Sequence, residues 1–147
     1  MKEPLWRPSP ERVAASQLTS FMRLATERSG RAFPDFAALW RWSVEDIEGF
    51  WDAVWDFCGI VAETKGARVL VDGDQMRGAR FFPDARLNFA ENLLRTRGAG
   101  DAIIFRGEDQ VRRRLSWDAL HAEVSRLQAA LAAAGVKPGD RVAGFVA

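Results

Sequence analysis

LSWDALHAEVSRLQAALAAAGVKPGDRVAGFV, residues 115–146, is the stretch from which the fold is inferred. Ser116 is suited to be a helix N-cap, because its hydroxyl can accept a hydrogen bond from an early backbone N–H. Gly135 suits the left-handed position after a helix, and Pro138 blocks continuation. Between these signals, apolar side chains recur at spacings of three and four, which predicts one amphipathic helix. They are Trp117, Leu120, Val124, Leu127, Leu131 and Ala134.

The residues after this helix predict a turn at 137–140 and a mostly apolar strand at 141–146. An apolar strand that follows a crossover helix belongs in a parallel sheet covered on both faces. The sequence ends within this strand, so we expect it to be the front part of a longer protein. The predicted fold class is mixed α/β, with a helical N-terminal region followed by the start of an α/β sheet domain.

The first part of the chain predicts several helices. Ser9-Pro10 is a helix start and Gly30 a helix end, with a second start at Ser16 that would make two short helices. A short helix is expected over residues 35–42, and Ser43 is expected to cap the next one. That next helix carries an unusually aromatic stripe, which we interpret as core rather than as a cofactor site. The stripe consists of Ile47, Phe50, Trp51, Val54, Trp55 and Cys58.

The middle of the chain predicts short strands, turns and one more helix. Strands are expected at 68–71, 80–83, 102–105 and 111–115, and Asp72-Gly73-Asp74 is interpreted as a turn rather than a calcium loop. A helix is expected over 87–94. Its Asn88 and Asn92 would share one face, where they either hold a neighbouring loop or are solvated. Residues 97–100 are interpreted as a linker. The basic cluster Arg112-Arg113-Arg114 is expected to protect a strand edge from mispairing, without a partner.

Composition excludes several classes of protein. The 147 residues are 48% hydrophobic, with six Trp and ten Phe, which is ample material for a core. A net charge of +1 gives no electrostatic case for binding nucleic acid or a membrane. No signal peptide or membrane-spanning run is visible, so we expect a cytoplasmic protein. The single cysteine, Cys58, excludes an internal disulfide and is expected to be a buried, inert thiol.

Residues that carry chemistry are scarce. Neither of the two common glycine-rich phosphate loops occurs. The one histidine, His121, lies beside the apolar stripe of its helix and is expected to be exposed or hydrogen-bonded rather than catalytic. No pair of carboxylates has a setting that suggests acid–base catalysis. The sequence therefore nominates no catalytic, cofactor-binding or metal-binding residue.

Two groups of residues resemble the adenylate-forming acyl-CoA synthetases. The helix at Ser116-Trp117, followed by residues 135–142 (GVKPGDRV), is similar to the entry into the main sheet of that family. Residues 42–51 and 81–92 (FFPDARLNFAEN) resemble the N-terminal region of the short-chain members. The form ARLNFAEN, with Arg106-Gly107-Glu108-Asp109 later, is most similar to the acetoacetate-specific subgroup. Acetate-specific members usually carry Asp-Arg-His where this chain has Leu93-Leu94-Arg95.

This resemblance implies both a domain organisation and a reaction. Residues 1–98 would be the N-terminal region, and residues 99–147 the start of the AMP-binding domain. The full-length enzyme would use ATP, CoA and Mg²⁺ to convert acetoacetate to acetoacetyl-CoA, AMP and diphosphate through an acyl-adenylate. The family's catalytic residues lie beyond residue 147, so the fragment alone is expected to be inactive. Its partners would be these small molecules and the remainder of its own chain.

Two alternatives remain open at the level of sequence. One is a fragment of an acetyl- or propionyl-CoA synthetase. The other is a stand-alone, non-catalytic module whose aromatic helices bind a partner protein. On either ligase interpretation, the apolar residues of the last predicted strand would lack cover in the fragment, which predicts poor solubility or self-association.

Overall fold

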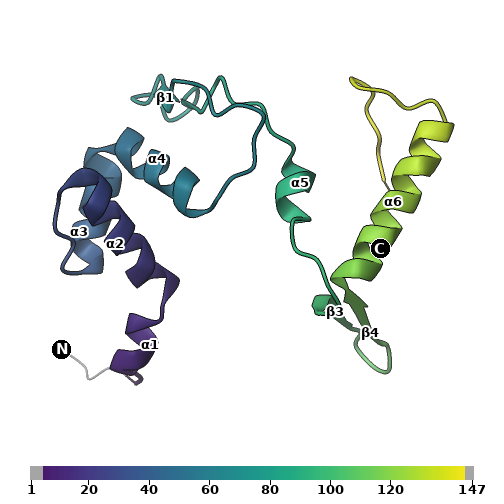
Figure 1. Ribbon diagram of the computed structural model, residues 1–147, viewed down its shortest axis with the longest axis horizontal. Coiled ribbons are helices and arrows are strands. Elements are labelled where there is room, and N and C mark those ends of the chain that lie inside the picture. Colours follow the sequence, from purple (N-terminus) through teal and green to yellow (C-terminus); the bar gives the residue numbers. More distant parts are fainter. Residues whose placement is uncertain (1–4, 145–147) are drawn as a thin grey trace. The chain divides into compact units, whose positions relative to one another are not determined.

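A computed structural model describes residues 5–144 (Figure 1). Internal contacts divide the chain into two compact units, Met1–Asn88 and Phe89–Ala147. The boundary predicted at residues 98/99 is one between domains inferred from a family resemblance, and it differs from the division by internal contacts. It stays a prediction. The mixed α/β class is confirmed, because the described residues form helices together with two small antiparallel sheets.

Unit 1 begins with four helices whose ends follow local signals. The helices are α1 (Pro10–Ala14), α2 (Gln17–Ser29), α3 (Phe36–Glu45) and α4 (Ile47–Phe57). The two starts predicted at Ser9 and Ser16 are both confirmed, since each hydroxyl accepts a hydrogen bond from the backbone N–H three residues later. Gly30 ends α2 in the left-handed conformation, with φ of 69°.

The cap predicted at Ser43 is wrong. Helix α3 continues through Ser43 to Glu45, and Asp46 is the N-cap of α4. The Ser43 hydroxyl instead donates to the carbonyl oxygen of Trp40 within α3, at 2.7 Å. Serine often makes such a bond inside a helix and then no longer acts as a cap. The helix boundary therefore lies three residues later than the sequence suggested.

The core of unit 1 lies where α2, α3 and α4 pack together. Its buried members are Phe21, Ala25, Leu39, Trp42 and Ala53, and partly buried aromatic rings surround them. Phe21 contacts Phe50 edge-on, with ring centroids 5.7 Å apart, an arrangement that aromatic pairs favour. The interpretation of the α4 aromatic stripe as core is confirmed for Phe50 and Val54. Trp51 and Trp55 contact the following hairpin instead.

Two very short strands follow, β1 (Leu70–Val71) and β2 (Arg80–Phe81), paired antiparallel with Leu70 opposite Phe81. They confirm two of the predicted extended segments, although each strand is shorter than expected. Between them, Asp72 has a φ of 56° and its carbonyl oxygen accepts from the Gln75 N–H at 3.1 Å, which confirms the predicted turn.

Unit 2 consists of α5 (Phe89–Leu93), β3 (Asp101–Arg106), β4 (Arg112–Ser116) and α6 (Trp117–Ala133). Strands β3 and β4 form the predicted antiparallel hairpin, with Ile104 opposite Arg114. Helix α6 confirms the prediction from the opening stretch. The Ser116 hydroxyl accepts from the Ala119 N–H at 3.2 Å, and Gly135 follows the helix with φ of 84°.

The strand predicted at residues 141–146 is not present over 141–144, and the remaining positions lie outside the described residues. The turn before it is confirmed, because the Lys137 N–H donates to Asp140 Oδ2 at 3.0 Å. None of the described strands lies against residues 141–144. A strand needs a hydrogen-bonding neighbour to be stable, so this segment has no regular structure within the part of the chain that is described.

Candidate functional site

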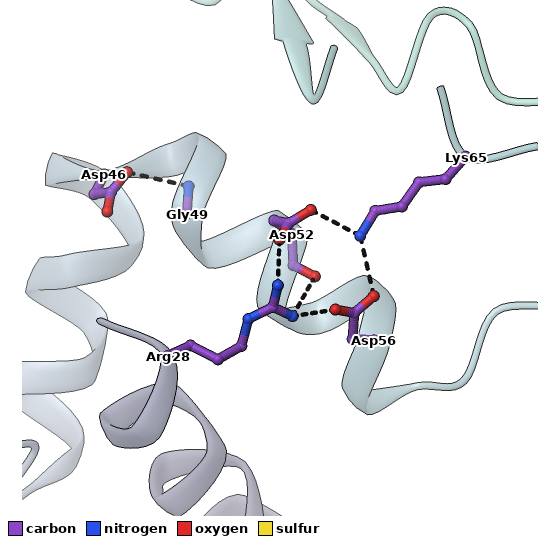
Figure 2. Close-up of polar contacts among 6 residues, drawn as sticks. All are labelled: Arg28, Asp46, Gly49, Asp52, Asp56 and Lys65. Carbon is purple, nitrogen blue, oxygen red and sulfur yellow. Dashed lines mark hydrogen bonds and ion pairs between the residues drawn. The ribbon is translucent and has the colours of Figure 1, made fainter. Parts of the chain in front are cut away.

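Four charged side chains from α2, α4 and the loop after α4 form the most connected polar cluster among the described residues (Figure 2). Arg28 contacts both carboxylates of α4, with its Nη2 2.6 Å from Asp52 Oδ2 and its Nη1 on Asp56. Lys65 also contacts both, with its Nζ 2.7 Å from Asp52 and 3.0 Å from Asp56. We call this set the α4 ion cluster.

The charges of the α4 ion cluster balance, and this decides what the cluster can do. Asp52 and Asp56 are four residues apart on one helix, where like charges repel, and two cations offset that repulsion. The hydrogen bond from Lys65 lowers the pKa of Asp56, with a smaller contribution from Arg28. Burial opposes the charge on Lys65, but its bonds to Asp52 and Asp56 raise the pKa of Lys65 overall.

Both shifts favour the charged forms of Asp56 and Lys65 in the neutral range, so neither of these two groups is set to exchange a proton there. Each of the four groups already has charged partners within the cluster. The arrangement is a structural clamp between α2, α4 and the following loop, rather than a site for acid–base catalysis. Surface ion pairs of this kind contribute about 0.2–1 kcal/mol each, and more when they form a network.

Asp46 serves two acceptor roles at the junction of α3 and α4. Its Oδ1 accepts from the Gly49 N–H at 3.1 Å, which caps α4 (Figure 2). Its Oδ2 accepts from the indole Nε1 of Trp42 at 2.9 Å. The Trp42 side chain is 3% exposed, so this bond satisfies a donor that is otherwise shielded from water. One carboxylate thereby fixes both the helix junction and the central ring of the core.

The loop after α4 and the β1–β2 hairpin are attached to α4 through Trp55. The Phe82 ring lies 4.6 Å from the Trp55 ring, and the Lys65 ammonium lies 5.7 Å from its centroid. Phe82 adopts a φ of 44°, which is costly for a residue with a side chain. This conformation is maintained by the Phe82 N–H, which donates to the Val69 carbonyl at 2.8 Å, and by the ring contact.

Cys58 does not lie where the sequence predicted. It is exposed, so the expectation of a buried thiol is wrong. Helix α4 ends at Phe57, and Cys58 is the residue that follows its last turn. The helical spacing that assigned Cys58 to the core stripe therefore no longer applies at that position. The thiol lies outside the set of residues that pack between α2, α3 and α4.

Other residues singled out in the sequence are placed as follows. His121 is hydrogen-bonded as expected, with its Nε2 2.9 Å from the Thr96 carbonyl oxygen. Asn88 immediately precedes α5 and Asn92 lies within it, so the helix is shorter than predicted and contains only the second asparagine. The three arginines lie on β4 as expected, and Arg114 pairs with Asp101 of β3.

The described residues do not include a cluster of three or more His, Cys, Asp or Glu side chains that could hold a metal ion. The described residues also line apolar grooves, which include two beside helices. One, of about 610 Å³, lies among α1, α2 and the segment before α3, and it includes Val13, Met22 and Phe33. The other, of about 420 Å³, lies along the second half of α6, and it includes Leu127, Leu131 and Val136.

Sequence reasoning did not identify the α4 ion cluster, although one signal was present. Asp52 and Asp56 at positions i and i+4 of an aromatic helix require nearby cations, because adjacent like charges are unfavourable. Arg28 lies 24 positions before Asp52 and 28 positions before Asp56. Lys65 lies 9 positions after Asp56. Such long-range partners cannot be chosen from periodicity.

Comparison with known proteins gives a consistent result. Residues 36–93 match the family described as acetyl-coenzyme A synthetase N-terminus. The chain is 54% identical over 145 residues to an acetoacetyl-coenzyme A synthetase of Rhizobium meliloti (strain 1021), a match that covers 99% of this chain and 22% of that protein. It is 34% identical over 154 residues to malonamoyl-CoA synthetase vrtB of Penicillium aethiopicum, covering 99% of this chain and 21% of that protein.

A solved structure gives the same match. The acetoacetyl-CoA synthetase from Streptomyces lividans superimposes with a TM-score of 0.83 at 41% sequence identity, covering 96% of this chain and 22% of that one. The chain therefore spans about a fifth of the length of the proteins that it matches. Among the described residues, no helix is long and apolar enough to cross a membrane.

Proposed function

Since this chain matches the N-terminal region of acetoacetyl-CoA synthetases along nearly its whole length, we propose that it is the N-terminal scaffold of an ATP-dependent acid–thiol ligase. The proposed reaction joins acetoacetate to CoA. The carboxylate attacks the α-phosphate of ATP to give acyl-adenylate and diphosphate, and the CoA thiol then displaces AMP to give the thioester. The observation that carries this proposal is the 54% identity over 145 residues.

The residues of this chain have a supporting role in that proposal. The described residues offer no metal cluster, and their best-connected polar groups are mutually paired. They therefore give no fit to Mg²⁺, and no step of the reaction is assigned to them. What they provide is a folded four-helix unit and a hairpin–helix unit, on which the catalytic part of the ligase would be built. We place this protein in the cytoplasm, with its own remaining chain as the main partner.

We further propose that residues 1–98 form the N-terminal region and residues 99–147 the start of the AMP-binding domain. The family match ends at residue 93, shortly before this boundary, and β3 begins at Asp101, shortly after it. The exposed apolar stripe of α6 supports the assignment of residues 99–147 to a larger domain. Leu127 is 61% exposed, and Val124 beside it is also exposed, which is unusual for the apolar face of an amphipathic helix.

The proposed acyl substrate is acetoacetate. A relative named for malonamoyl-CoA shares the same region, so this region accompanies synthetases with different acyl groups. The test is thioester formation by the full-length protein with acetoacetate, acetate, propionate and malonamate, each with ATP, CoA and Mg²⁺. We expect acetoacetate to give the highest kcat/KM. A clear preference for another acid would replace acetoacetate as the substrate, and no thioester with any of them would refute the ligase.

A non-catalytic interaction module remains the second candidate. The observation that favours it is the exposed apolar surface of α3, where Phe36, Trp40 and Val44 are each more than half exposed. Such patches mark protein contacts. The same assay separates the two candidates, because an interaction module would produce neither AMP nor thioester with any of the acids.

A further inference from the structure

Residues 97–100 were expected to be a linker, but the structure shows this glycine-containing segment attached to the start of α6. The N–H of Trp117 donates to the Gly100 carbonyl oxygen at 3.0 Å, and the N–H of Asp118 donates to the Gly98 carbonyl oxygen at 3.1 Å. These are the first two amides of the helix, which have no partner within the helix itself. We call residues 96–100 the strap.

Two side chains of α6 hold the strap from the other direction. Asp118 Oδ1 accepts from the Gly98 N–H at 2.8 Å, so Asp118 and Gly98 exchange two hydrogen bonds. One turn later, His121 Nε2 donates to the Thr96 carbonyl oxygen at 2.9 Å. With the Ser116 hydroxyl on the third amide, each of the first three N–H groups of α6 has an acceptor. These three N–H groups are therefore paired, two of them with carbonyl oxygens of the strap.

The backbone of the strap requires glycine at one position and tolerates a side chain at another. Gly98 has a φ of 106°, which residues with a side chain rarely adopt, and a Cβ added there would meet no atom within 4 Å. Its requirement for glycine is therefore conformational and not a matter of space. Gly100 is equally open, but its φ is not in the positive range. The two glycines form a matched pair for testing the strap.

We propose that the strap fastens the segment after α5 to the N-terminal end of α6, with Asp118 and His121 as its positioning residues. The strap then sets where β3 begins relative to α6. A displacement of α5 would be passed to the first turn of α6, instead of being absorbed by a flexible glycine linker. This role does not depend on which acyl group the protein handles, or on its being a ligase.

Hydrogen exchange and limited trypsin digestion of the full-length protein test the strap directly. Arg97 is exposed and precedes Gly98, so cleavage after it requires only that the strap detach. In the unmodified protein we expect slow exchange at the amides of Gly98, Trp117 and Asp118, and slow cleavage at Arg97. Gly98→Ala should speed cleavage at Arg97 about tenfold, because its backbone strain favours the detached form. Gly100→Ala is the matched control and should leave the rate unchanged.

Variants of Asp118 and His121 distinguish loss of the strap's hydrogen bonds from a general loss of folding. Asp118→Ala and His121→Ala should each speed exchange at the Gly98 amide by about the same factor as Gly98→Ala. Asp118→Asn keeps an acceptor oxygen, and His121→Gln keeps an N–H donor, so both should restore much of the protection. Exchange in α2, which belongs to the other unit, should not change.

Two results would overturn the proposal. The first is equal cleavage at Arg97 in the Gly98→Ala, Gly100→Ala and unmodified proteins. The second is faster amide exchange spread evenly over residues 89–144 in the alanine variants, with no restored protection in the Asn and Gln variants. That pattern would indicate a general loss of folding. Should Asp118→Ala or His121→Ala fail to fold, the cleavage rate at Arg97 in Gly98→Ala compared with Gly100→Ala still decides between these outcomes.

Discussion

The double role of Asp46 makes its replacement the most informative change in unit 1. Asp46→Ala removes the cap on the Gly49 N–H and also the acceptor of the Trp42 indole N–H. Loss of an N-cap costs about 0.5–2 kcal/mol, and leaving a buried donor unpaired costs about 1–3 kcal/mol. We therefore expect the free energy of unfolding to fall by about 1.5–5 kcal/mol, a large part of the stability of a small domain.

Asp35 provides a matched control, because it is an N-cap with a single acceptor role. Its Oδ1 accepts from the Ala38 N–H at 2.8 Å at the start of α3. Asp35→Ala should cost only the capping contribution, about 0.5–2 kcal/mol. Asp46→Asn should be intermediate, since the amide oxygen can accept one of the two bonds and the amide nitrogen cannot accept the other.

The assay is urea unfolding followed by far-UV circular dichroism, with Trp42→Phe included to complete a double-mutant cycle. If Asp46 binds the indole as described, Asp46→Ala should cost less in the Trp42→Phe background than in the unmodified protein. The reasoning would be refuted if Asp46→Ala were no more destabilising than Asp35→Ala, or if the cycle showed no coupling between Asp46 and Trp42.

Three further outcomes are expected from the remaining contacts of unit 1. Lys65→Gln should lower the free energy of unfolding in urea by about 0.5–2 kcal/mol, and by less at high salt. Unchanged stability at low salt would contradict a stabilising role for the α4 ion cluster. The pKa of Asp56 is lowered in the folded state, so the stability that Asp56 contributes is present above its ordinary pKa of about 4 and is lost as the pH falls through the folded-state pKa. Acid titration should therefore narrow the difference in free energy of unfolding between the unmodified protein and Lys65→Gln. Phe82→Ala should be less stable than Phe82→Gly by about 1 kcal/mol in urea unfolding, because only glycine relieves the positive φ; the reverse order would show that the strain is not real.

Helix ends that depend only on neighbouring residues could be predicted from the sequence. Ser9, Ser16 and Ser116 all cap helices, and Gly30 and Gly135 follow them in the left-handed conformation. Each of these signals acts over three or four residues, so tertiary contacts are not needed to specify it. The same holds for the β3–β4 hairpin, whose strands are joined by a short turn.

Features that depend on tertiary contacts could not be predicted in this way. Asp46 was passed over in favour of Ser43, because its second acceptor role depends on the position of the Trp42 ring in the core. The strap was mistaken for a linker because its hydrogen-bond partners, Asp118 and His121, lie about twenty or more residues away. Glycines indicate that a backbone can adopt many conformations, but they do not indicate whether tertiary hydrogen bonds hold it in one of them.

The polar groups that the structure brings together in the described residues have structural partners. The charged groups of the α4 ion cluster neutralise each other, and the one histidine of the chain donates to a backbone carbonyl. Catalytic groups are recognised by perturbed protonation near the working pH in a concave site. The shifts in this cluster move the pKa values of Asp56 and Lys65 further from neutrality, which is the opposite pattern.

ATP–pyrophosphate exchange is the measurement that tests the central claim most directly, because it reports acyl-adenylate formation without requiring CoA. With radiolabelled pyrophosphate, ATP and Mg²⁺, the full-length protein should show exchange that depends on acetoacetate, and residues 1–147 alone should show none. Exchange catalysed by residues 1–147 would contradict the assignment of this chain as scaffold. Failure of the full-length protein to exchange with acetoacetate, acetate, propionate or malonamate would contradict its assignment to a ligase.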